Sequence, residues 1–305
     1  MKISAKGTHI RKSTGEKIFD FFNVLFMALF TLTCVYPFYY IIIYSLSDPL
    51  KAAGGVLLWP VDFTWDNYLR IFKLKGLPEA TWISVSTTVI ATLEAMFING
   101  MVGYLMSRQT MPFRKFIYRT FVVTMYISGG LIPSFLLMKY LGFYNTYFIY
   151  IIPGVSAYYM ILIKTYIESI PASLEESAKL DGASYWTIMI RIIMPLSIPI
   201  LATVGVFTAV GSWSNYNTTL IYTVDNELRN LQYILYQYLK NASAILLQSI
   251  NNPAAAGGAN SVARQLTPTS IKMTLVVITV VPILCVYPYL QRYFVKGIML
   301  GAVKG

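Results

Sequence analysis

Six long runs of apolar residues, separated by shorter polar segments, dominate the pattern along this chain. They cover approximately residues 18–46, 82–106, 116–138, 144–167, 192–222 and 271–294. Each run is long enough for an α-helix to cross about 30 Å of hydrocarbon. Prolines interrupt several runs, which membrane helices tolerate because neighbouring groups satisfy the freed backbone. The pattern predicts an all-α membrane protein with six transmembrane helices.

The basic residues give this predicted bundle an orientation. Residues 1–17 form a basic tail before the first run, and Arg108, Arg114 and Lys115 follow the second. With both termini inside, Lys and Arg concentrate in the inner segments, as the positive-inside rule requires. The first run is far longer than the core of a signal peptide and is predicted to be retained. We expect a cytoplasmic tail at 1–17, one transmembrane domain at 18–305, and both termini in the cytoplasm.

Two outer segments are longer than simple connections. Residues 47–80 contain a turn at Trp59-Pro60 and a short helix expected near Asn67, at the membrane interface. Residues 223–268 carry apolar side chains at helical spacing between Leu228 and Leu239, which predicts an amphipathic helix on the outer face. Residues 251–261 are rich in Ala, Gly and Asn, and are predicted to form a flexible loop.

Composition agrees with a membrane protein and removes other classes. The chain is 56% hydrophobic and 12% charged, with a mean hydropathy of +0.58, whereas soluble domains are about one quarter charged. The net charge of +11 is spread singly between apolar runs, so we expect no nucleic-acid partner. Cys34 and Cys285 each lie alone inside an apolar run, which argues against a metal site or a disulfide.

One charged segment lies between the fourth and fifth apolar runs, at residues 171–191. Ser173 and Glu176 have the spacing of a helix N-terminal capping box, and Pro171 precedes them. Gly182 follows Asp181 where a left-handed helix stop is expected. The segment therefore predicts a short cytoplasmic helix. A solvated turn between two membrane spans is the alternative that the local pattern leaves open.

The spacing within this segment resembles the cytoplasmic loop of ATP-binding-cassette (ABC) importer permeases, known as the EAA motif. That motif has Glu-Ala-Ala, three residues, Gly, nine residues, Ile, one residue and Leu-Pro. Here the frame is Glu176-Ser177-Ala178, Gly182, Ile192 and Met194-Pro195. Ser177 and Met194 depart from the motif, and both changes are mild in size.

Further segments resemble carbohydrate permeases, specifically the second permease of maltose-type systems and its branch for complex oligosaccharides and uronides. They are residues 63–72, 103–108, 128–133 and the C-terminal 291–305. The resemblance implies a type I ABC importer permease fold in the bacterial cytoplasmic membrane. It also implies partners: a homologous second permease, two cytoplasmic ATPase subunits and an extracytoplasmic solute-binding protein. The chain has no phosphate-binding Gly-x-x-x-x-Gly-Lys-Ser/Thr loop, so we expect no cofactor here, with ATP and magnesium held by the ATPases.

The same resemblance implies roles for residues of the 171–191 segment. The expected helix would dock into a groove of an ATPase, with small residues allowing close approach. Glu176 can cap its own helix, contact a basic group of the ATPase, or do both, and Asp181 would fix the turn before Gly182. The expected coupling residues are Ser173, Glu176, Ala178, Asp181, Gly182, Ala183 and Pro195.

Polar and aromatic residues at membrane depth are candidates for a substrate pathway. Sugar hydroxyls pair with amides and sugar faces stack on aromatic rings, and the fifth run ends with both residue types. The alternative is an outer aromatic belt, and for the tyrosines of the fourth run simple packing. Glu94 is the carboxylate deep in a span, where such a group is costly and functional by default; a structural role is equally open. The candidates are Trp213, Asn215, Tyr216, Asn217, Tyr158, Tyr159, Glu94 and Asn99.

The favoured function is therefore an ATP-driven oligosaccharide importer, of which this chain is the permease and not an enzyme. A permease for amino acids or polyamines is the alternative within importers. An ion-coupled secondary carrier that uses Glu94 is the alternative from another class; sensitivity of uptake to an uncoupler, with ATP intact, would favour it.

Overall fold

The computed structural model describes residues 13–56, 58–73, 76–152, 154–240 and 267–302. The predicted loop at 251–261 and the first twelve residues of the basic tail lie outside this part of the chain. Within it, regular structure is helical, apart from one isolated bridge between Ser47 and Phe63. The chain divides into two compact units, residues 1–68 with 260–277, and residues 69–259 with 278–305.

The first unit begins with the long helix α1 (Thr14–Ser45). The Glu16 carboxylate accepts a hydrogen bond from the Ser13 backbone N–H (2.8 Å), the reciprocal half of a capping box. Large apolar side chains from Ile18 to Phe38 are exposed, and burial begins only in the last turn. A helix that is apolar all round is suited to lipid or to another membrane helix.

A buried polar cluster holds the end of α1 to two other segments of the first unit. The Asn67 amide donates to the carbonyls of Ser45 and Ser47 (2.8 Å each) and accepts from the Ser270 hydroxyl (3.0 Å). Asn67 belongs to α2 (Asp66–Phe72), the short helix predicted there, and Ser270 to α13 (Pro268–Ala302). The 3-10 turn η1 (Lys51–Gly54) is held by the Asp48 carboxylate, which accepts from the N–H of Lys51.

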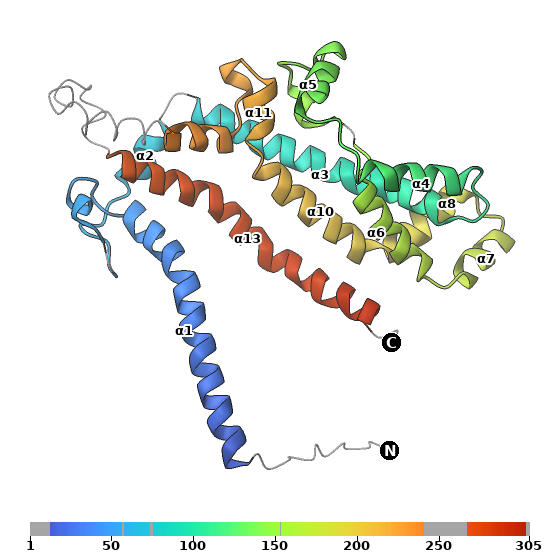
Figure 1. The fold of residues 1–305 in the computed structure, drawn as a ribbon, viewed down its shortest axis with the longest axis horizontal. Helices are drawn as coiled ribbons and strands as arrows, with labels where there is room; N and C mark the ends of the chain where they lie inside the picture. Colours follow the sequence, from blue (N-terminus) through green and yellow to red (C-terminus); the bar gives the residue numbers. More distant parts are fainter. Residues whose placement is uncertain (1–12, 57, 74–75, 153, 241–266, 303–305) are drawn as a thin grey trace. The chain divides into compact units, whose positions relative to one another are not determined.

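The second unit is built on α3 (Leu77–Ser107), which packs against α6 (Ala157–Glu168) and α10 (Ile198–Trp213). Glycines permit this close packing, as is usual between membrane helices. A Cβ at Gly103 would lie 2.7 Å from Ile163, and one at Gly205 would lie 2.8 Å from the Met96 sulfur. Figure 1 shows α4 (Arg114–Thr124), α7 (Ser173–Leu180) and α8 (Tyr185–Ile188) near the C-terminal end of α3, and α11 (Asn217–Tyr222) near its other end.

The third and fourth apolar runs are not single long helices, contrary to prediction. The third forms α4 (Arg114–Thr124) and α5 (Leu131–Tyr140), separated by the non-helical residues 125–130, which end at Gly130 with a φ of +80°. The fourth forms the 3-10 turn η2 (Tyr147–Tyr150) and then α6, with no helix at 151–156 among its described residues. Gly130 in the first case and Gly154 after Pro153 in the second explain why an apolar run does not continue as helix.

The fifth apolar run is bent by 76° between Tyr185–Leu196 and Ile198–Trp213. The first arm comprises α8 (Tyr185–Ile188), a π-helical turn η3 (Met189–Ile193) and α9 (Met194–Leu196). Pro199 lacks the N–H that would bond the carbonyl of Pro195, which favours a break there. After α10 come α11 (Asn217–Tyr222), the 3-10 turn η4 (Asn226–Leu228) and helical residues 231–240, where a helix was predicted.

Three described helices are long and apolar enough to cross a membrane: Thr14–Ser45, Leu77–Ser107 and Thr269–Val286. The bent pair Tyr185–Leu196 and Ile198–Trp213 raises this to four if it crosses as one span.

Candidate functional site

The predicted cytoplasmic helix is α7 (Ser173–Leu180), but it starts differently from the prediction. Ala172 is its N-cap, and no side chain caps it. Ala172 already has helical backbone angles, and its carbonyl accepts from the N–H of Glu176 (3.0 Å), which the capping box would have given to Ser173. The predicted capping box between Ser173 and Glu176 is therefore wrong.

The end of α7 matches the prediction. Gly182 has φ +80°, and its N–H donates to the carbonyl of Lys179 (3.0 Å). The N–H of Ala183 donates to the carbonyl of Ala178 (3.0 Å). These two bonds form a Schellman motif, in which a glycine occupies the left-handed position. Backbone hydrogen bonds therefore make the turn, and the Asp181 side chain forms no hydrogen bond or ion pair among the described residues.

The two faces of α7 have different surroundings. Glu175 and Ala178 are buried, and Ala178 belongs to the core formed with α3, α6 and α10. Leu174 is exposed and Leu180 is 89% exposed. Ala178 thus faces its own protein and is absent from the expected docking surface. The exposed residues of α7 include the large apolar Leu174 and Leu180 beside the polar Ser173, Glu176, Ser177 and Lys179, so they do not form the small-residue surface that the sequence predicted.

A buried ion pair fixes the inner face of α7 to the end of α3. Glu175 is 5% exposed, and its carboxylate pairs with the guanidinium of Arg108, the C-cap of α3. Lys179 Nζ lies 3.1 Å from the other Glu175 oxygen, as an ion pair without hydrogen-bond geometry. The Arg108 guanidinium also lies 4.6 Å from the centre of the Tyr104 ring. Burial lowers the pKa of Arg108, yet a guanidinium stays protonated in proteins.

A second set of charges lies beside this pair. Arg114 donates to Glu168 (2.7 Å) and to the carbonyl of Met106 in the last turn of α3 (2.6 Å). Lys164 donates to the other oxygen of Glu168 (2.7 Å). The two sets border a cleft of about 590 Å³, which is lined by Arg108, Glu168, Glu175, Glu176 and Lys179 together with neighbouring residues of α3, α6 and η3.

Sequence reasoning missed Glu175 and Arg108 as partners. Glu175 precedes the motif residue Glu176, and no spacing rule connects it with Arg108. The signal that the sequence did contain is helical periodicity: Glu175 and Ala178 are three residues apart, so they lie on the same face of the helix. Of the other expected coupling residues, Pro195 lies in α9, just before the 76° bend, Ser173 is the first residue of α7, and Ala183 follows Gly182 beyond its end.

The residues at the end of α10 do not share one environment. The Asn215 amide binds both the backbone N–H (3.2 Å) and the hydroxyl (2.9 Å) of Thr218, near the start of α11. Tyr216 stacks on Tyr236 with ring centres 4.8 Å apart, and Tyr233 continues the stack. Asn217 is the first residue of α11. Tyr233 and Tyr236 were missed, although both lie in the predicted helix between Leu228 and Leu239.

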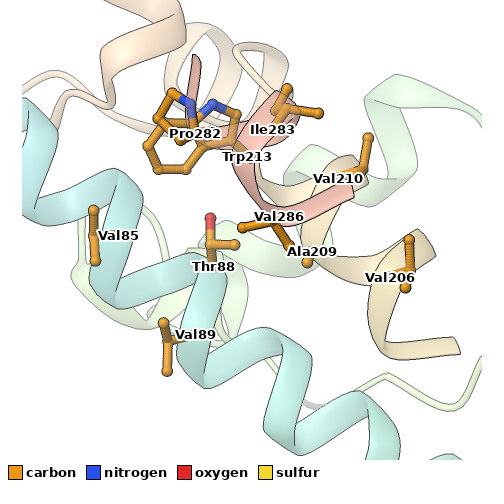
Figure 2. Close-up of a pocket in the computed structure, with 10 residues that line it drawn as sticks. All are labelled: Val85, Thr88, Val89, Val206, Ala209, Val210, Trp213, Pro282, Ile283 and Val286. Atoms are coloured by element: carbon orange, nitrogen blue, oxygen red, sulfur yellow. The ribbon is translucent and has the colours of Figure 1, made fainter. Parts of the chain in front are cut away.

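Trp213 instead borders an apolar pocket of about 180 Å³ between α3, α10 and the second-unit part of α13. Its indole N–H donates to the carbonyl of Thr279 (2.9 Å). Figure 2 shows Trp213 and Thr88 at this pocket among aliphatic side chains. With the indole N–H already bonded, Trp213 offers only its ring, and the aliphatic lining suits an apolar group better than a sugar.

Asn99 is fully buried and binds backbone groups of the interrupted fourth run. Its amide oxygen accepts from the N–H of Ser156 (2.8 Å), at the N-cap of α6, and its amide nitrogen donates to the carbonyl of Ala95 (2.8 Å). Non-helical backbone at membrane depth needs such partners. This geometry favours the structural role of Asn99.

The remaining pathway candidates are placed separately. One Glu94 oxygen is buried and has no hydrogen-bond partner among the described residues. Tyr158 is exposed, whereas its neighbour Tyr159 packs against the core around α6. These positions leave Glu94 and Tyr158 available to a ligand or to another chain.

Comparisons with known proteins agree on one family. Residues 4–300 match the family described as binding-protein-dependent transport system inner membrane component. The polygalacturonan/rhamnogalacturonan transport system permease protein YtcP of Bacillus subtilis (strain 168) is 35% identical over 292 residues, covering 95% of this chain and 99% of that one. Protein LplC of the same strain is 32% identical, with 97% and 98% covered.

A solved structure is also similar. It is the crystal structure of a bacterial ABC transporter involved in the import of the acidic polysaccharide alginate, with a TM-score of 0.81 and 26% identity. The match covers 93% of this chain and 99% of that chain.

Proposed function

This chain belongs to the family of binding-protein-dependent transport system inner membrane components, and from that membership we propose that it is the permease subunit of an ATP-driven oligosaccharide importer. Its substrates are oligosaccharides that include uronic acids. The support is that a relative is described as a polygalacturonan and rhamnogalacturonan permease, and a structural neighbour as an importer of alginate. All three of these polysaccharides contain acidic sugars.

The proposed assembly contains a homologous second permease, two cytoplasmic ATPase subunits and an extracytoplasmic solute-binding protein. The ATPases bind ATP and magnesium. This chain has six spans and cytoplasmic termini, with α4 and α5 together forming the third span, η2 and α6 the fourth, and the bent pair the fifth. The broken spans are consistent with a bundle in which irregular backbone is buried or lines a cavity.

The observation that carries the proposal is the two-sided character of α7. Its inner face is held by Arg108 and the core, whereas Leu174 and Leu180 are exposed together with Ser173, Glu176, Ser177 and Lys179. Tyr185 and Trp186, in α8, are also exposed. Large apolar side chains exposed among polar and charged ones are typical of a protein interface, and the partner is an ATPase subunit, whose closure would tilt the attached helices.

Substrate residues are proposed from the stack that continues α10. Tyr216 stacks on Tyr236 of the 231–240 helix and the neighbouring Asn215 amide binds Thr218, and aromatic faces and amides are the groups that bind sugars. Glu94 and Tyr158 complete the proposed pathway. Asn99 supports it by fixing the backbone around Ser156, and Trp213 by packing.

Uptake by the reconstituted complex tests this function. The four-subunit complex in proteoliposomes, with its binding protein, is given labelled trigalacturonate and, as a comparison, neutral maltotriose. We expect uptake of trigalacturonate that requires ATP and persists when an uncoupler removes the proton gradient. Uptake that requires the gradient and not ATP would refute the importer and favour a carrier that uses Glu94.

A further inference from the structure

The Arg108–Glu175 pair joins two elements that the proposed function makes mechanically important. Glu175 lies on the helix that meets the ATPase, and Arg108 ends the 31-residue helix α3. Both charges are withdrawn from solvent, since their side chains are 6% and 21% exposed. The pair therefore lies between the exposed face of α7 and the packed interior of the protein.

Stability alone is a weak reason for such a pair. Removing two charges from water is costly, and well-packed apolar residues often stabilise a protein equally well. What the pair adds is a fixed orientation of α7 relative to the end of α3, because a carboxylate and a guanidinium bind only in a narrow range of geometries. Removing Arg108 would leave the buried Glu175 carboxylate with Lys179 as its remaining cation, and removing Glu175 would leave the Arg108 guanidinium without its carboxylate on α7.

The end of α3 is also held from two other sides. Arg114, at the start of α4, donates to the Met106 carbonyl and to Glu168 of α6. Lys164 of α6 completes that cluster. The α3 terminus is therefore held by α4, α6 and α7 together. Because the Arg108–Glu175 pair joins α7 to α3 directly, a displacement of α7 does not have to pass through the chain between α6 and α7 to reach α3.

α3 then extends this displacement along the second unit. It carries Glu94 and Asn99, packs along α6 and α10, and through Ser84 accepts from the N–H of Leu231 at its other end (2.8 Å). A rigid helix with close contacts along its length transmits motion without bending.

We propose that Arg108 and Glu175 are positioning residues that transmit the movement of the ATPase from α7 to α3. The proposal rests on the proposed function, because it requires α7 to be the docking helix. Loss of the pair leaves α7 able to bind the ATPase and leaves ATP hydrolysis intact, while α3 no longer follows α7. Hydrolysis and uptake then become uncoupled.

The first test compares Glu175→Gln and Arg108→Gln with wild type in the reconstituted complex, and uses Lys115→Gln as a control. Lys115 is an exposed cation of α4 outside the clusters above. We expect both neutral variants to hydrolyse ATP but to take up at least about tenfold less trigalacturonate per ATP, within the range of allosteric coupling. The control keeps the wild-type ratio. A wild-type ratio in Glu175→Gln overturns the proposal.

A second measurement needs no sugar. Spin labels at Gln109→Cys and Ser177→Cys, both exposed positions, are placed in a Cys34→Ser/Cys285→Ser background. We expect one narrow distance that is the same without nucleotide and with ATP and vanadate, and a broad distribution in Glu175→Gln. An equally narrow distribution in that variant overturns the link. If wild type fails to import trigalacturonate while the label distances behave as expected, the substrate proposal fails and the link stands.

Charge reversal separates the link from a simple folding defect. If a neutral variant does not assemble, Arg108→Glu/Glu175→Arg/Lys179→Glu reverses all three charges and keeps the pairing. Recovery of assembly and of the uptake-to-hydrolysis ratio supports the link. Failure to recover either one overturns it.

Discussion

At the scale of single residues, Gly103 allows α3 and α6 to approach more closely than a side chain would permit. An alanine Cβ there would lie 2.7 Å from Cγ2 and 2.9 Å from Cβ of Ile163, which is fully buried. Atoms of a packed core cannot give way without cost, and overpacking destabilises by about 1–3 kcal/mol.

We therefore expect Gly103→Ala to lower the thermal midpoint of the detergent-purified protein. Gly211→Ala in α10 is the matched control, since no atom lies within 4 Å of its added Cβ. The double variant Gly103→Ala/Ile163→Ala should regain part of the loss because it restores space. If Gly103→Ala is as stable as Gly211→Ala, the close approach of the two helices is not as described.

The residue types in the sequence indicated which polar residues lie deep in the protein better than which groups they contact there. The composition identified Glu94 and Asn99 as unusual at membrane depth, and Asn99 is indeed fully buried. Its partners, Ser156 N–H and the Ala95 carbonyl, depend on where the fourth run stops being helical, which periodicity does not show. Glu175 and Arg108 were missed for a related reason: an ion pair between distant segments exists only after the helices have packed.

At the scale of elements, the end of α7 is sensitive to substitution because it depends on the backbone conformation of Gly182. Gly182 has φ +80° and open space around it. A Cβ there would meet no described atom within 4 Å, but an L-residue in the left-handed region costs about 1–2 kcal/mol. The same open space is what a docking partner would occupy.

We expect Gly182→Trp to insert into the membrane normally and to abolish ATP-driven uptake, because it distorts the turn and fills the proposed docking surface. Gly182→Asn should retain much of the uptake, since asparagine tolerates the left-handed region better. Uptake and the amount of protein in the membrane are measured together. Full uptake by Gly182→Trp would refute the docking role of α7.

Two capping sequences show why elements are only partly predictable. Ser13-x-x-Glu16 starts α1 with the reciprocal bond from Ser13 N–H to Glu16, whereas Ser173-x-x-Glu176 has the same spacing and makes no cap. At the second site the helical backbone starts one residue earlier, at Ala172, so the N–H of Glu176 donates to the Ala172 carbonyl and not to the Ser173 side chain. The Gly182 stop was predicted correctly because it depends on the conformation of one residue.

At the scale of the whole molecule, hydrophobic pattern and motif spacing were sufficient for the family, which the comparisons confirm. They were not sufficient for the continuity of the spans. Gly130 and Gly154 interrupt runs whose mean hydropathy suggests unbroken helices. An interrupted apolar run and a continuous apolar helix have the same hydropathy, and only the packing of the folded protein distinguishes them. The orientation and the number of crossings remain predictions.

Cysteine labelling tests that topology. Ser177→Cys and Glu227→Cys, at exposed positions, are made separately in a Cys34→Ser/Cys285→Ser background. A maleimide that cannot cross the membrane should label Glu227→Cys in intact cells and Ser177→Cys only in inverted vesicles. Labelling of both sites from the same side would contradict six spans with the α7 segment inside.

The left-handed turn at Gly182 also restricts how this gene can change. No single-base change converts a glycine codon into an asparagine codon, so the best substitute for a left-handed position is out of reach in one step. From the codons GGT and GGC aspartate is within reach, and it tolerates that conformation. It would, however, add a negative charge beside Asp181 at a helix C-terminus, where the helix dipole disfavours it. Among the amino-acid substitutions that single-base changes produce at this codon, we therefore expect none to match glycine in transport, even though a Cβ there would meet no described atom within 4 Å.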